Sequence, residues 1–101
     1  MRFDKLVRDK IPDIIRAKGE TATTHVAEVV ERKAKLREKL QEELNEYIES
    51  GRLEELADLL EVIHGICALH GIAFEDVEAL RKYKAEVRGG FEQGIILEET
   101  R

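Results

Sequence analysis

The chain has 101 residues, of which 43% are hydrophobic and 39% charged, and its formal net charge is −5. This length suits a single domain over residues 1–101, or one part of an obligate oligomer. The composition excludes collagen-like and low-complexity chains, and the helical spacing of the apolar residues argues against disorder. A high charge with a single proline is typical of long helices with solvated faces.

The first twenty residues and the single cysteine together favour a cytoplasmic protein. Charges are spread too evenly over residues 1–20 for the apolar run of a signal peptide. The most apolar stretch, residues 59–74, is interrupted by Glu61, His64 and His70, so no membrane span is expected. Cys67 has no second cysteine to pair with, which suits a reducing compartment.

Charge is distributed unevenly along the chain. Residues 1–18 hold six basic side chains against three acidic ones, whereas residues 38–61 hold nine acidic side chains against Lys39 and Arg52. An acidic middle of this kind repels phosphates unless a cation lies between them. Direct binding to nucleic acid is therefore not expected.

The N-terminal third predicts one short helix and an extended segment. Pro12 suits the first turn of a helix, and Gly19 is placed to end that helix after residue 18. Residues 20–26 contain three threonines and a valine, which favour extended structure or a brief strand.

Three longer helices are predicted after that segment, over residues 29–49, 53–70 and 74–88. The first has apolar side chains at helical spacing: Leu36, Leu40, Leu44, Tyr47 and Ile48. Gly51, Gly71 and Gly89 are placed to end the three helices, and the tail from Phe91 is expected to be extended. The fold class is therefore all-α, with an antiparallel hairpin of two long helices plus a further helix.

The helix at residues 53–70 is apolar on nearly every face, and helices of this kind normally lie inside a protein. A chain with three main helices cannot easily surround one of them. We therefore expect a homodimer or higher homo-oligomer, in which the helices of several chains form a four-helix-type bundle.

Carboxylates lie within this apolar helix and on the helix before it. Glu55 and Asp58 are three residues apart, as are Glu43 and Glu46. In an antiparallel hairpin these four side chains can face one another, and buried carboxylates need a cation or a wet cleft. An all-oxygen quartet suits Mg²⁺, with Mn²⁺ as a possible substitute, and the absence of histidine and cysteine makes zinc improbable. The alternative is a pair of ordinary solvated acidic faces.

At these residues the sequence resembles a known family. EELNE at 42–46 and EELAD at 54–58 resemble the EExxE…ExxD signature of the all-alpha NTP pyrophosphatase superfamily, which includes MazG-like proteins, dimeric dUTPases and phosphoribosyl-ATP pyrophosphohydrolase. KLVRDKIP at 5–12, LEELADLLEVI at 53–63 and RGGFEQGI at 88–95 resemble its short, single-domain branch of predicted house-cleaning nucleotide pyrophosphatases. The resemblance covers nearly the whole chain.

The resemblance implies magnesium-dependent hydrolysis of a nucleoside triphosphate between its α and β phosphates, which yields a monophosphate and pyrophosphate. The implied metal ligands are Glu43, Glu46, Glu55 and Asp58. Glu42 would lie behind them or orient the attacking water, so Glu42 and Glu43 are the catalytic candidates. The short connection between Glu46 and Glu55 leaves little protein for a base pocket, and the base and sugar stay unpredicted.

Basic residues supply candidates for binding the phosphates of the substrate. Lys5, Arg8 and Lys10 form a cluster near the N-terminus, and Lys84 and Arg88 share one face of the last predicted helix. The alternative for both groups is ordinary surface charge. Phe91 can stack on a base or simply pack against the protein.

The expected protein is thus a hydrolase of phosphoric anhydrides that removes noncanonical or excess nucleotides. Two alternatives stay open. One is phosphoribosyl-ATP hydrolysis in histidine biosynthesis, which the same signature allows. The other is a non-enzymatic helical dimer or adapter, whose acidic residues are only solvated charge.

Overall fold

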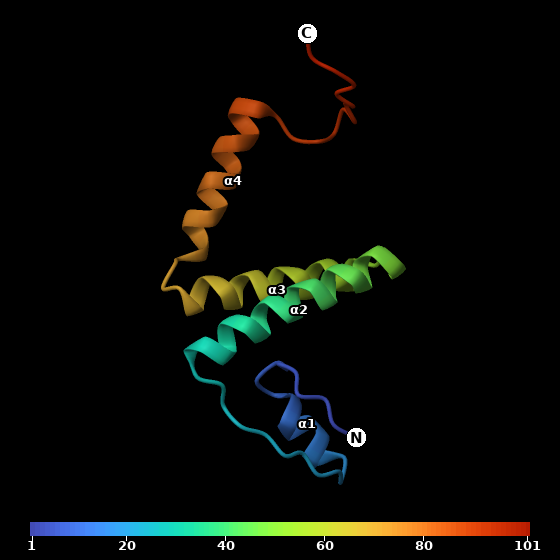
Figure 1. Ribbon diagram of the computed structural model, residues 1–101, viewed down its shortest axis with the longest axis vertical. Helices are drawn as coiled ribbons and strands as arrows, with labels where there is room; N and C mark the ends of the chain where they lie inside the picture. Colours follow the sequence, from blue (N-terminus) through green and yellow to red (C-terminus); the bar gives the residue numbers. More distant parts are fainter. The chain divides into compact units, whose positions relative to one another are not determined.

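The computed structural model describes residues 1–101 as four helices and no strand (Figure 1). The helices are α1 (Ile11–Ala17), α2 (Val29–Ser50), α3 (Leu53–Leu69) and α4 (Phe74–Arg88). The expected all-α class is confirmed. The chain divides into two compact units, residues 1–71 and residues 72–101, and each is described by itself.

α1 and the segment after it follow the expectation only in part. Pro12 lies in the first turn of α1, and Gly19 follows the helix with a left-handed φ of 84°. The brief strand considered for residues 20–26 does not form. A strand needs a partner ladder, and no other segment of the chain is extended in a way that provides one.

α2 and α3 form an antiparallel hairpin and lie side by side (Figure 1). The turn consists of Gly51 and Arg52. Gly51 has a φ of 64°, and its N–H donates to the carbonyl of Tyr47 at 2.7 Å, which closes the last turn of α2. Because only two residues separate the helices, α3 must run back along α2.

The apolar core of the hairpin is small. The buried apolar side chains are Leu36 on α2 with Val62 and Cys67 on α3. A Cβ built on Gly65 would lie 3.2 Å from Leu36 Cδ2, so the absence of a side chain there lets the two helices approach closely. Cys67 is a buried free thiol, as expected for a core residue.

One stripe of α3 remains uncovered in the single chain. Leu53, Leu56 and Leu60, at positions i, i+3 and i+7, are 80%, 45% and 47% exposed. These positions lie on one face of a helix. The first unit by itself therefore does not enclose α3, and the expected association of chains stays a prediction.

Residues 1–10 form an irregular arm that lies against the hairpin through polar contacts. Lys5 Nζ lies 3.2 Å from Glu42 Oε1, and Arg8 Nη2 lies 2.8 Å from Asp58 Oδ1. Lys35 Nζ donates to the carbonyl of Asp4 at 2.7 Å. Asp4 has a φ of 47°, a left-handed conformation that aspartate tolerates better than most residues.

The second unit contains α4 and the tail. On α4, Arg81 Nη2 pairs with Glu78 Oε1 at 2.6 Å, and Gly89, with a φ of 85°, follows the helix. The tail forms neither a helix nor a strand, and it begins with a turn in which the N–H of Gly94 donates to the carbonyl of Phe91 at 3.1 Å. No single helix of the chain is both long and apolar enough to cross a membrane, and α3 with α4 reaches that length and composition only as a bent pair.

Candidate metal centre

Carboxylates from both helices of the hairpin converge in two groups of three. One group is Glu42, Glu43 and Glu46, and the other is Glu43, Glu55 and Asp58. In each group, one oxygen per residue lies within 4.8 Å of the others. Glu43 belongs to both groups, so the two groups together contain all four predicted ligands and Glu42.

Local sequence explains this convergence. Glu43 and Glu46 are three residues apart on α2, and Glu55 and Asp58 have the same spacing on α3, so each pair lies along one helical face. The two-residue turn then places Glu43 opposite Glu55 and Asp58 near the closed end of the hairpin, whereas Glu46 groups with Glu42 and Glu43 of its own helix. The spacing within each helix is a property of the sequence, whereas the approach of carboxylates from the two helices depends on how the helices pack.

Glu43 is the most buried of these carboxylates, with an exposed fraction of 5%. Its Oε1 lies 3.3 Å from Lys39 Nζ, one helical turn earlier. Its Oε2 is buried and has no hydrogen-bond partner. A buried carboxylate oxygen without a partner is costly, so this atom needs a donor or a cation. Oε2 is thus the unsatisfied atom in the residue that both carboxylate groups share.

The negative charge around Glu43 changes the pKa of Glu46, one helical turn later. A hydrogen bond that protonated Glu46 would donate to Glu43 raises the pKa of Glu46 above its usual value, as does the negative charge of Glu43, with smaller contributions from burial, Glu55 and Glu42. Carboxylates that share a site resist losing their last proton. A cation bound among them would relieve this repulsion.

Glu42 behaves in the opposite way. Burial raises the pKa of Glu42, but the hydrogen bond from Lys5 and the charge of Lys39 outweigh it and hold the pKa below its usual value. The pKa of Lys39 is correspondingly raised by Glu43 and Glu42, against the effect of its own burial. Glu42 is therefore an ionised, hydrogen-bonded carboxylate beside the group.

Glu55 and Asp58 complete the set from α3. Glu55 is 8% exposed, and its Oε1 accepts a hydrogen bond from Ser50 Oγ at 3.4 Å and lies 3.5 Å from Arg52 Nη2. Asp58 is half-buried, and its Oδ1 is held by Arg8. Ser50, at the end of α2, and Arg52, in the turn, thus hold the carboxylate of Glu55 in place.

A pocket of about 250 Å³ lies between the arm and the hairpin at this point. The residues that line it are Lys5, Val7, Arg8, Ile11, Lys39, Glu43 and Asp58. Carboxylates and cations therefore face the same hollow, which is the arrangement needed to hold a metal ion and an anion together. The donors around it are carboxylate oxygens, which is the ligand chemistry that Mg²⁺ prefers.

The structure brings some of the predicted phosphate-binding residues to this pocket and leaves others elsewhere. Lys5 and Arg8 line it, whereas Lys10 is exposed at the N-cap position of α1 and does not. Lys84 and Arg88 belong to α4 in the second unit, and their assignment stays a prediction.

Lys39 is a site residue that the sequence analysis did not single out. It contacts Glu42 at 3.4 Å and Glu43 at 3.3 Å. The available signal was its position, three and four residues before two glutamates on one helix, a spacing that brings such side chains together.

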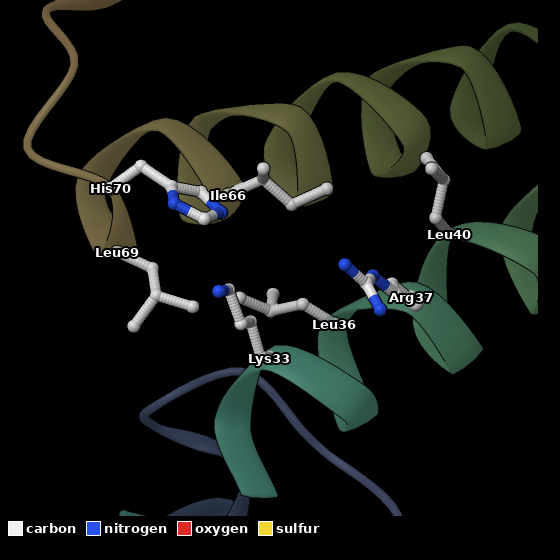
Figure 2. A pocket seen from close by; sticks show the side chains of 7 residues that line it. All are labelled: Lys33, Leu36, Arg37, Leu40, Ile66, Leu69 and His70. Carbon is white, nitrogen blue, oxygen red and sulfur yellow. The ribbon is translucent and has the colours of Figure 1, made fainter. Parts of the chain in front are cut away.

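A second pocket, of about 280 Å³, lies farther from the turn of the hairpin (Figure 2). Figure 2 shows side chains from both helices lining it: Lys33, Leu36, Arg37, Leu40, Ile66, Leu69 and His70. It contains no carboxylate, so it offers no ligand set for a hard divalent cation. The metal-ligand candidates therefore lie outside this pocket.

Comparison with known proteins yields no significant match to any family model, curated protein or solved structure.

Proposed function

We propose that this chain is a magnesium-dependent nucleoside triphosphate pyrophosphohydrolase, which cleaves between the α and β phosphates to give a monophosphate and pyrophosphate. The observation that carries the proposal is the unpartnered, buried Oε2 of Glu43 at the junction of two carboxylate groups. Without a cation, a cluster of this kind contains both repulsion and an unsatisfied oxygen. Mn²⁺ is expected to substitute for Mg²⁺.

The ligands in this proposal are Glu43, Glu46, Glu55 and Asp58. Magnesium bound there would neutralise the triphosphate and lower the pKa of a coordinated water. Glu42 stays ionised because of Lys5 and Lys39, so it can accept a hydrogen bond from the attacking water and orient it. Glu42 thus acts beside the ligands, and Glu43 acts as the ligand shared by both carboxylate groups.

Binding of the phosphates falls to basic side chains of the arm. Lys5 and Arg8 line the same pocket as Glu43 and Asp58, so their donors face the space that a metal-bound anion would fill. Lys10, Lys84 and Arg88 are further candidates for the outer phosphates. The proposed cellular role is removal of noncanonical nucleotides in the cytoplasm, by a homodimer or higher homo-oligomer.

The deciding experiment measures pyrophosphate release from a panel of canonical, deoxy and damaged nucleoside triphosphates, with Mg²⁺ and then with EDTA. The test variant is Asp58→Ala, and the matched control is Glu54→Ala, because Glu54 lies one turn earlier on α3 but in neither carboxylate group. We expect release that requires metal, disappears in Asp58→Ala and survives in Glu54→Ala.

Two other outcomes would favour phosphoribosyl-ATP hydrolysis or a non-enzymatic helical adapter instead. Metal binding without turnover of any panel member would favour an unusual substrate, and phosphoribosyl-ATP is then the next compound to test. Absence of both turnover and metal binding would contradict the proposal and leave the helical adapter as the better description.

A further inference from the structure

The ion pair between Arg8 and Asp58 suggests how the arm and the metal centre interact. Arg8 Nη2 lies 2.8 Å from Asp58 Oδ1, a charge-assisted hydrogen bond across 50 positions of the sequence. Asp58 is also one of three carboxylates, with Glu43 and Glu55, whose oxygens lie within 4.8 Å of one another. Each carboxylate of that group therefore has a cation of the protein beside it, because Lys39 lies near Glu43 and Arg52 near Glu55, but only the cation beside Asp58 comes from the arm.

The other cations near the group are held differently. Lys39 belongs to α2 and reaches Glu43 from one turn away, and its side chain is only 20% exposed. Lys5 pairs with Glu42, which also has Lys39 as a partner and is not in the group with Asp58. Arg8 is thus the link between the arm and the carboxylate group that spans both helices.

The side chains of this link are accessible and can separate. Arg8 is 56% exposed and Asp58 is 39% exposed, so water can solvate both when the pair opens. The arm has attachments on either side of Arg8, because Lys35 holds the carbonyl of Asp4 and α1 begins at Ile11. The guanidinium can therefore swing while the arm stays in place.

We propose that Arg8 is an exchangeable counter-ion of the metal centre. In the metal-free protein it pairs with Asp58, and a divalent cation that binds Asp58 displaces it. The released guanidinium remains at the same pocket, where it can donate to an anionic group such as a phosphate. This inference rests on the proposed function, because it takes Asp58 as a metal ligand.

Coupling between metal and anion follows from this exchange. Without metal, an anion must compete with Asp58 for Arg8, whereas with metal Arg8 is free. Each ligand therefore improves the affinity for the other by the same factor. Arg8 thus acts as a counter-ion that the metal displaces and as a direct donor to the anion.

The primary test is calorimetric titration of Mn²⁺ into the full chain without nucleotide. Arg8→Gln removes the competing charge and keeps an uncharged, polar side chain, although a shorter one. Because exposed ion pairs contribute up to about 1 kcal/mol, Arg8→Gln should bind Mn²⁺ about two- to fivefold more tightly than wild type. Arg8→Lys restores a charge and should return the affinity toward the wild-type value.

Two control variants separate exchange from a general change in charge. Arg2→Gln removes a guanidinium of the same arm that pairs with Asp4 instead, and it should leave the Mn²⁺ affinity unchanged. Lys5→Gln removes a cation from the same pocket, and its effect should be smaller than that of Arg8→Gln because Lys39 still holds Glu42. Equal effects of Lys5→Gln and Arg8→Gln would overturn the proposal.

An NMR measurement on the wild-type protein gives an independent test that needs no stable variant. The Nη2–H signals of Arg8, which donate to Asp58, should shift and lose protection from solvent exchange as Mg²⁺ is added, whereas the guanidinium signals of Arg2 should not. An unchanged Arg8 signal in magnesium-saturated protein would refute the exchange while leaving the metal site intact. Failure of wild type to bind either metal would contradict the proposed function itself.

Discussion

At the scale of single residues, Glu43 and its neighbours explain the chemistry of the candidate site. Glu43 has one oxygen beside Lys39 and one oxygen that is buried without a partner. Glu42 is stabilised in its ionised form, whereas Glu46 holds its proton more tightly than usual. Adjacent carboxylates therefore differ in protonation behaviour because only some of them have cations of the protein beside them.

The raised pKa of Glu46 predicts how pH affects the metal-free protein. The folded state binds the proton more tightly than the unfolded state, so this group's contribution to stability is full at low pH and is lost as pH rises from the ordinary value of 4.5 through the raised one. Glu46→Gln cannot ionise, so it should not lose stability over this pH range in the way that wild type does. In EDTA, the variant should gain stability relative to wild type as pH increases, as measured by urea unfolding.

Magnesium should make wild type more stable than Glu46→Gln, which is the reverse of their order in EDTA. Because Glu46 is one of the proposed ligands, Mg²⁺ should raise the unfolding midpoint of Glu46→Gln less than that of wild type. Glu49→Gln is the control, since Glu49 is an exposed acid of the same helix outside both groups. Identical pH profiles for wild type and Glu46→Gln in EDTA would contradict the assigned repulsion.

At the scale of helices, the two-residue turn positions the site. Gly51 ends α2 in a left-handed conformation, and the position of α3 opposite Glu43 and Glu46 depends on that reversal. Gly65 acts in the packed middle of the hairpin, where Leu36 of α2 comes closest. Two glycines thus serve the same hairpin for different reasons, one conformational and one steric.

Gly51→Ala should lower the free energy of unfolding by about 1 kcal/mol, because an L-residue pays for a positive φ. No atom lies within 4 Å of the Cβ that the substitution adds, so the cost is conformational and not steric. Gly51→Asn should recover part of the loss, since asparagine tolerates the left-handed region. Urea unfolding measures all three proteins, and equal stability of Gly51→Ala and wild type would show that the turn has another conformation.

At the scale of the whole molecule, one chain leaves much apolar surface uncovered. Only three apolar side chains are buried, and none of them is completely inaccessible. Exposed apolar residues also occur on α2 near the turn, at Leu44 and Ile48, besides the α3 stripe of Leu53, Leu56 and Leu60. Exposed apolar side chains of this kind favour association, because burying them removes apolar area from water.

Introducing charge into the α3 stripe should therefore dissociate the protein. We expect wild type to sediment as a dimer or larger assembly, and the double variant Leu56→Glu, Leu60→Glu to sediment as a monomer. Val30→Glu is the control, because Val30 is 83% exposed at the start of α2 and lies outside the stripe. A monomeric mass for the wild-type chain at micromolar concentration would refute the expected oligomer.

The helices were predictable because the information for them is local. Apolar spacing, Pro12 and the terminal glycines predict bounds that agree with the structure to within one or two residues. The spacing of Glu43 with Glu46, and of Glu55 with Asp58, is equally local. The prediction failed for a possible strand at residues 20–26, where local preference had no partner segment to satisfy it.

The sequence by itself thus determined the helical class, the helix bounds and the presence of paired carboxylates, because short-range backbone and side-chain preferences decide all three. Only the tertiary structure decided that Glu43 is buried with one unpartnered oxygen, that Lys39 neutralises its other oxygen, and that Arg8 pairs with Asp58. Contacts across 50 positions, such as the last, depend on how the arm and hairpin pack, and no local pattern encodes that packing.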